Sequence, residues 1–131
     1  MTRLVTTSLL ALALTACQSA SAPAPQKAMR GESVVLGYRG RAIFDERLDI
    51  QFVGIGEDSR CPRDVTCFWQ GQVQVLLSAR VDGASATSHE VIAGQSAAID
   101  SWQLTVLDVQ PERASETQIP LEDYRILLKA E

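Results

Sequence analysis

From about residue 30 onward, hydrophobic and polar side chains alternate, which is the period of a β-strand with one buried face. The clearest run is residues 72–81, where Leu76 alone interrupts the alternation. We therefore predict a strand with one face in the core and the other in water. Its hydrophobic face carries Val73, Val75, Leu77, Ala79 and Val81, and its polar face carries Gln72, Gln74, Ser78 and Arg80.

Several shorter segments show the same alternation, and none of ten or more residues holds a clear helical period. Residues 121–130 are the ambiguous case, because a strand and a helix both fit their pattern. The further predicted strands cover residues 34–38, 48–52, 102–106 and 124–128, and Pro111 ends the run that follows Trp102.

Turns and bulges can also be predicted. Asp82-Gly83 has the residue types that tolerate positive φ in a two-residue hairpin, so residues 84–92 should return antiparallel. The alternation changes phase after Phe52, which predicts a β-bulge at Phe52 or Gly54, and it changes again near Leu107. Residues 31–131 are thus predicted to form one all-β domain, a small antiparallel sandwich or barrel of six to seven strands.

The N-terminus has the pattern of a secretory signal peptide covering residues 1–16. Arg3 precedes the short apolar run 4–14, which is too short to span a membrane. The following Leu-Thr-Ala-Cys at 14–17 resembles the lipobox of bacterial lipoproteins. That resemblance implies acylation of Cys17, with palmitate-type chains, and anchoring in the cell envelope. An ordinary cleaved signal, with Cys17 removed or free, is the alternative, and either one exports the protein.

Residues 17–30 are rich in Ala, Ser and Pro and are predicted to be a lipidated tether. Gln18 would be the second residue after processing. The lipoprotein sorting pattern then implies the outer membrane, facing the periplasm, if the source is Gram-negative. Without Arg3, eleven basic residues face sixteen acidic ones, so the mature chain has a formal charge of −5. We therefore expect neither nucleic acid nor anionic lipid as a partner, and membrane contact only through acyl chains.

Cys61 and Cys67 remain as an even pair in an oxidising compartment, and a disulfide is the expected outcome. Other chemistries fit less well. A zinc site needs more Cys or His ligands, and a thioredoxin-like pair needs C-x-x-C at a helix start. Glu57, Asp58 and Asp64 match no EF-hand spacing. We therefore expect no metal and no cofactor.

The residues around this pair include candidate contact and structural positions. If the strand over 72–81 extends backwards with unbroken alternation, Trp69 faces the core beside the disulfide and Phe68 faces outward. The candidate interaction residues are therefore Phe68 and, because the disulfide-stiffened loop presents them, Arg60 and Arg63. The expected structural positions are Asp58, Pro62, Trp69 and Gly71, with Asp58 and Ser59 bonding to nearby backbone amides.

The motif Asp-Ser-Arg-Cys-Pro at 58–62, followed by Cys67-x-Trp69-x-Gly71, resembles a group of uncharacterised small bacterial secreted proteins and lipoproteins. The similarity spans most of residues 33–128 and includes the late strand ending at Pro111. It implies this fold and the cysteine pairing, and it carries no activity. Such proteins often have an aromatic residue beside the late proline, where this chain has Glu112.

The function predicted from these features is a tethered binding or interaction module of the cell envelope. Its partner would be an envelope protein or polymer. An inhibitor of an envelope hydrolase using loop 56–71 is one alternative, and a structural component or chaperone-like subunit is another. A small hydrolase or metal protein is the competing class, for which His89 is the only neutral-pH base. We predict no catalytic residue, and a pocket that gathers Asp58, Asp64 or His89 would favour an enzyme.

Overall fold

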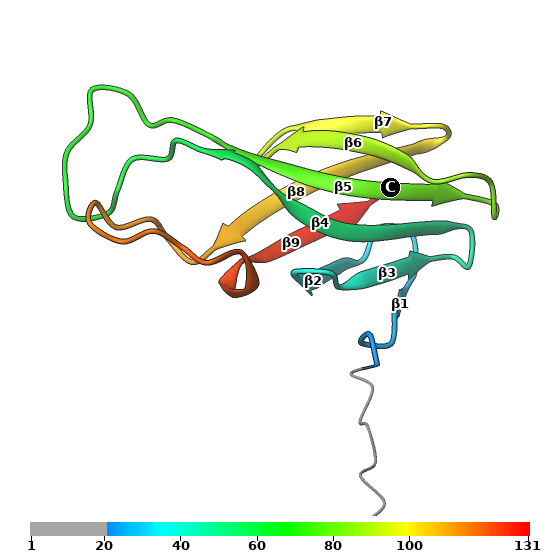
Figure 1. Ribbon diagram of the computed structural model, residues 1–131. Coiled ribbons are helices and arrows are strands. Elements are labelled where there is room, and N and C mark those ends of the chain that lie inside the picture. The colour runs from blue at the N-terminus through cyan, green and yellow to red at the C-terminus, as the bar shows by residue number, and fades with distance from the viewer. Residues whose placement is uncertain (1–20) are drawn as a thin grey trace, which may run out of the picture.

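The computed structural model describes residues 21–131, and in this range it has nine strands, one 3-10 turn and no α-helix (Figure 1). The all-β prediction is confirmed. The strand number exceeds the predicted six to seven because three strands, β1, β3 and β7, have only three or four residues, too few for alternation to reveal them. Within the described range no helix is long and apolar enough to cross a membrane.

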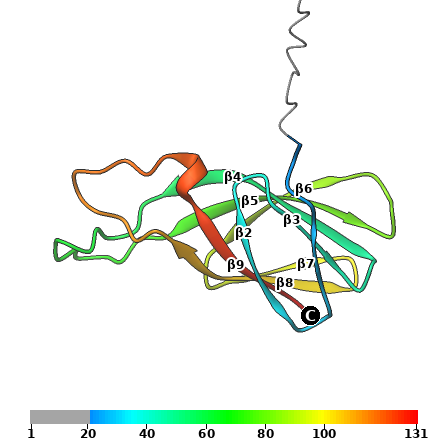
Figure 2. The same cartoon turned by 90° about the horizontal axis from the view of Figure 1, so that it is seen from below.

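The strands form two sheets that pack face to face as a sandwich (Figure 2). The first sheet has the order β1-β3-β4-β5-β6, and the second has the order β2-β9-β8-β7. The first sheet consists of β1 (Gln26–Ala28), β3 (Arg41–Phe44), β4 (Leu48–Asp58), β5 (Val73–Val81) and β6 (Thr87–Ile92). The second consists of β2 (Ser33–Gly37), β7 (Ser96–Ile99), β8 (Trp102–Gln110) and β9 (Arg125–Ala130), with a 3-10 turn, η1 (Leu121–Asp123), before β9.

The core lies between the sheets and is built from the inward faces of the alternating strands. In β5 the buried residues occur at every second position from Val73 to Ala79, as predicted. Phe44, Phe52 and Leu104 are fully buried and are among the largest side chains of the core. This hydrophobic layer holds the sheets together and leaves the loops at both ends of the sandwich free to carry a site.

The predicted irregularities are present. Asp82 and Gly83 both have positive φ, and the amide of Ala84 donates to the carbonyl of Val81 to close the hairpin turn. The pairing of β4 with β5 shifts register between Phe52 and Gly54, and that of β8 with β9 shifts between Val106 and Asp108. Each phase change in the sequence is therefore a β-bulge that keeps the hydrophobic side chains on the core face.

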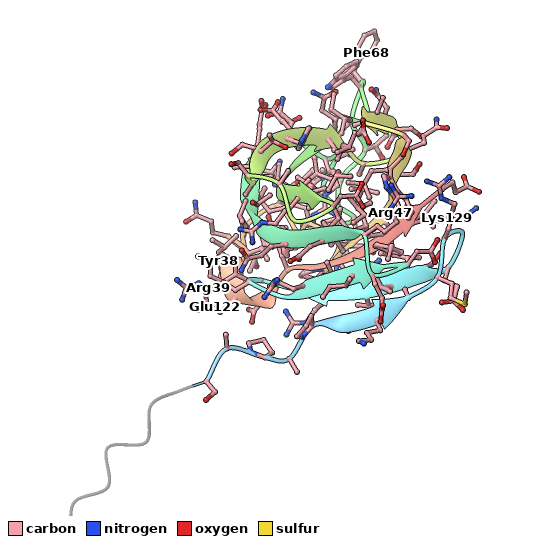
Figure 3. The ribbon with its side chains drawn as sticks, turned by 90° about the vertical axis from the view of Figure 1, so that its right-hand side faces the viewer. Tyr38, Arg39, Arg47, Phe68, Glu122 and Lys129 are labelled. Atoms are coloured by element: carbon pink, nitrogen blue, oxygen red, sulfur yellow. A yellow bond between two sulfur atoms is a disulfide. The ribbon has the colours of Figure 1, made fainter. Side chains whose placement is uncertain are left out.

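The described chain begins beside the first sheet, because β1 pairs in parallel with β3. This strand lies inside the stretch 17–30 predicted as a tether, so residues 26–28 belong to the sheet. The predicted signal peptide and the acylation site Cys17 lie outside the described residues. In Figure 3 the chain enters on the side of the molecule opposite to Phe68.

Candidate functional site

Two loops lie side by side at one end of the sandwich (Figure 1). The first, residues 59–72, joins β4 to β5 and is called the tip loop. The second, residues 111–120, joins β8 to η1 and is called the second loop. Cys61 and Cys67 form the predicted disulfide within the tip loop, with their Cα atoms 5.8 Å apart. The amide of Val65 donates to the carbonyl of Pro62 and makes a turn inside the disulfide ring.

The base of the tip loop is fixed by a polar cluster of Asp58, Arg60 and Tyr124. The Arg60 guanidinium donates twice to the Asp58 carboxylate, over 2.8 and 2.6 Å. It also donates to the main-chain carbonyls of Val109 and Pro111, at 2.7 and 3.1 Å. The Tyr124 phenol donates to Asp58 at 2.8 Å. Asp58 is the last residue of β4 in the first sheet. Val109 lies in β8 of the second sheet, and Tyr124 directly precedes β9 of that sheet. The cluster therefore joins the two sheets.

The cluster shifts the pKa of its members. Burial would by itself raise the pKa of Asp58, but the hydrogen bonds from Arg60 and Tyr124 and the charge of Arg60 bring it below its ordinary value. Burial, together with the hydrogen bond to Asp58, raises the pKa of Tyr124 to about 12. At neutral pH Asp58 is therefore an anion paired with Arg60, and Tyr124 is a neutral donor.

Acid should weaken the fold through Asp58. Its pKa in the folded state lies below the unfolded value of about 3.9, so its contribution to stability is complete above about pH 5 and is lost as the pH falls through the folded pKa. Asp58→Asn should therefore flatten the fall of the free energy of unfolding below about pH 4, measured by urea unfolding at a series of pH values. Asp100→Asn, in the turn between β7 and β8, is the control. Equal flattening in both variants would contradict this role.

The second loop holds the tip loop from the side. The amide of Arg63 donates to the carbonyl of Arg113 at 2.8 Å, and the Arg113 guanidinium donates to the carbonyl of Arg60 at 3.2 Å. The Asp64 carboxylate accepts from both the amide and the hydroxyl of Ser115. These hydrogen bonds lower the pKa of Asp64. The tip loop is thus constrained by a disulfide within it and by main-chain and carboxylate contacts across to the second loop.

The prediction that Trp69 lies in the core beneath the disulfide is wrong. Its exposed fraction is 69%, and Phe68 is fully exposed, so both neighbouring rings are in solvent. Gly71 explains the error. Its φ of +69° and its close approach to the main chain of Ser59 interrupt the extended backbone, and β5 begins only at Val73. Alternation therefore cannot be continued backwards from the strand to the aromatic residues.

The prediction that Arg60 points outward as a contact residue is wrong. Its side chain is only 19% exposed and is bonded to Asp58 and to two carbonyls. Arg63 and Phe68 are exposed, as a contact role requires. Asp58 and Ser59 do shape the loop. Asp58 accepts from the amide of Arg60, and the Ser59 hydroxyl both donates to the carbonyl of Gln72 and accepts from its amide.

A groove of about 610 Å³ separates the end of β4 from the second loop and η1. Asp58 and Tyr124 are among its lining residues, and Ile55, Ile119 and Leu121 add apolar surface. Asp64 and His89 do not line it; Asp64 binds Ser115, and His89 bonds to Thr87 on β6. Of the three residues whose gathering would favour an enzyme, the groove contains Asp58 alone. No three His, Cys, Asp or Glu side chains in residues 21–131 gather as metal ligands would.

Sequence reasoning missed Tyr124 and the second loop as parts of this end of the molecule. Tyr124 was expected only as the start of the last strand, and the second loop has no motif. The short pattern Asp-x-Arg at 58–60 was the available signal, since an Arg two residues after an Asp can fold back onto it. The partners of Arg60 beyond Asp58 are brought near it by packing of the two sheets, so local sequence does not indicate them.

Fold and site together define the chain as a small two-sheet β-protein with a disulfide-closed loop carrying exposed aromatic residues. The chain matches no protein-family model, no curated protein and no solved structure.

Proposed function

We propose that the protein is a lipid-anchored interaction module of the bacterial cell envelope, and that the end of the tip loop contacts a partner protein. The observation that carries this proposal is the exposure of Phe68 and Trp69 next to each other on a loop held by a disulfide. Val65, on the same loop, is also 48% exposed. Aromatic side chains of this kind contribute most to protein interfaces, and burying one fully is worth about 1.5 to 3 kcal/mol.

The constraint on the tip loop supports the same proposal. A loop that is already ordered loses little conformational entropy when it binds, so more of the contact energy appears as affinity. Here the disulfide, the Asp58–Arg60 pair and the Asp64–Ser115 contact restrict the loop before any partner arrives. The chain also enters on the side opposite to Phe68, so an anchor at Cys17 would direct the aromatic end away from its own membrane (Figure 3).

An inhibitor of an envelope hydrolase is the second candidate within this class. The observation that favours it is the shape of the loop. Phe68 projects with no neighbouring side chain covering it, and a convex, constrained loop is complementary to the concave cleft of an enzyme. Arg63 is the remaining basic residue available for such a contact, because the Arg60 side chain is bonded within the fold.

A photoreactive phenylalanine analogue placed at Phe68 tests the proposal in intact envelopes. We expect one discrete protein adduct on illumination, identified by mass spectrometry. The same analogue at Ser85, in the β5–β6 turn at the other end of the sandwich, is the control and should give none. Absence of an adduct at position 68, or the same adducts from both positions, would contradict the assignment of the tip loop as the contact surface.

Matched serine variants separate binding from folding. Phe68→Ser and Trp69→Ser remove exposed side chains and should change the free energy of unfolding by less than about 0.5 kcal/mol. With the photoreactive analogue placed at Gln70 instead, the yield of the protein crosslink should nevertheless fall in both variants. Cys17→Ser should weaken it as well if the anchor is needed to bring the partners together. A crosslink of unchanged strength in all three variants would refute the proposal.

A further inference from the structure

The strand β4 is much longer than its neighbour β3. It has eleven residues and pairs with β5 from Leu48 as far as Asp58, whereas β3 has four and pairs only with Leu48–Gln51. Hydrogen bonds between Phe52 and the chain before β3 extend this cover by one residue. For residues 53–57, no main-chain hydrogen bond from the described part of the chain reaches the side of β4 that faces away from β5.

The groove of about 610 Å³ lies beside this uncovered stretch. Ile55 and Asp58 line it from β4, and the opposite wall is formed by Arg113, residues 115–119, Leu121 and Tyr124. Figure 1 shows the same arrangement in the ribbon, where β3 accompanies one half of β4 and the second loop and η1 lie beneath the other half. The volume falls within the range of about 300 to 1,000 Å³ that is usual for ligand sites.

The chemistry of an uncovered strand edge selects its ligand. It presents alternating N–H and C=O groups at the spacing of an extended chain, and another extended main chain satisfies them best. Natural edges are protected by charged side chains, Pro or β-bulges; the stretch Val-Gly-Ile-Gly-Glu at 53–57 has two register shifts and the charge of Glu57 but no Lys or Pro, so its edge is only partly protected. Gly54 and Gly56 add no side chain there, and glycine in a strand is typical of places where a second backbone approaches closely.

We propose that an extended segment of a partner protein binds in this groove and adds to β4 as a strand at residues 53–57. The β4–β5 register shifts between Phe52 and Gly54 and between Ile55 and Asp58 limit the added strand to a short one. Ile55, Ile119 and Leu121 offer apolar contacts, and the segment 115–118 offers polar ones, so the preferred ligand alternates apolar and polar residues. This site is separate from Phe68 and Trp69 and does not depend on their role.

Random linear peptides displayed on phage and selected on the oxidised full chain provide the probe. We expect selected peptides with alternating apolar residues. Their binding should slow amide hydrogen exchange within residues 53–57, measured by NMR. Two N-methylated forms of each peptide are compared, one methylated at the odd positions and one at the even positions. Affinity should fall about tenfold or more in one phase of methylation and stay nearly unchanged in the other, because only one set of amides faces β4.

Three variants complete the test. Thr117→Trp fills the groove from an exposed lining position and should weaken peptide binding about tenfold or more, whereas Ser85→Trp at the far turn should not. Phe68→Ser should also leave it unchanged. Selection that yields no peptide, or peptides insensitive to N-methylation in both phases, would overturn the inference. Binding lost in Phe68→Ser alone would overturn it while supporting the tip loop as a contact surface. Self-association abolished by Thr117→Trp would identify a second copy as the occupant and equally overturn it.

Discussion

Gly71→Ala should be among the most damaging single substitutions in the loops, destabilising the fold by about 3 kcal/mol or more. Two effects add. The backbone of Gly71 is left-handed, with a φ of +69°, and an alanine Cβ would overlap the main chain of Ser59 and come within 3.1 Å of the Arg60 Cα. Neither neighbour is the flexible end of a side chain, so the start of the tip loop itself would have to move.

Gly83→Ala is the matched control for this prediction, because Gly83 also has a positive φ, of +74°, but a Cβ there would meet nothing within 4 Å. It should cost only about 1 kcal/mol, the penalty of the backbone conformation alone. Urea unfolding of both variants separates the close contact from the conformation. If both variants lost the same free energy of unfolding, the overlap of the new Cβ with Ser59 would be relieved at little cost, and the prediction would be contradicted.

Arg60→Met should destabilise the protein by about 2 to 4 kcal/mol. The substitution keeps much of the side-chain length but removes both hydrogen bonds to Asp58 and leaves that carboxylate, only 10% exposed, with Tyr124 and the Arg60 amide as its remaining donors. The carbonyls of Val109 and Pro111 also lose a donor. Arg60→Lys should recover little, because an ammonium group cannot reproduce the paired contact with the carboxylate.

The pair Arg47–Asp82 provides the comparison. It has the same two-bond geometry, at 2.7 and 2.8 Å, but both side chains are more than half exposed. Arg47→Met should therefore cost far less than Arg60→Met when unfolding is followed in urea under the same conditions. If the two substitutions proved equally costly, burial would not be the reason for the contribution of Arg60.

The alternation of side chains was enough to predict the sheets but not the tip loop. It placed the hydrophobic face of β5 and the bulge after Phe52, and the residue types of Asp82 and Gly83 placed the hairpin, because each of these features depends on neighbours in sequence. It failed at Trp69, where a single left-handed glycine breaks the period. Nor could local sequence show that the Arg60 side chain is bound within the fold, because its carbonyl acceptors are 49 and 51 residues away in sequence and are brought near only by packing of the sheets.

The attachment of β1 has a mechanical consequence. If the N-terminus is held at a membrane as proposed, a pull on the chain enters the fold at Gln26, whose side-chain amide donates to the carbonyl of Val35. The load then passes to the three pairings of β1 with β3 and to the bonds of Asp45 with Ala28 and Arg30. This short strand would detach before the hydrophobic layer between the sheets opened. The tether would then become longer while the rest of the sandwich stayed folded.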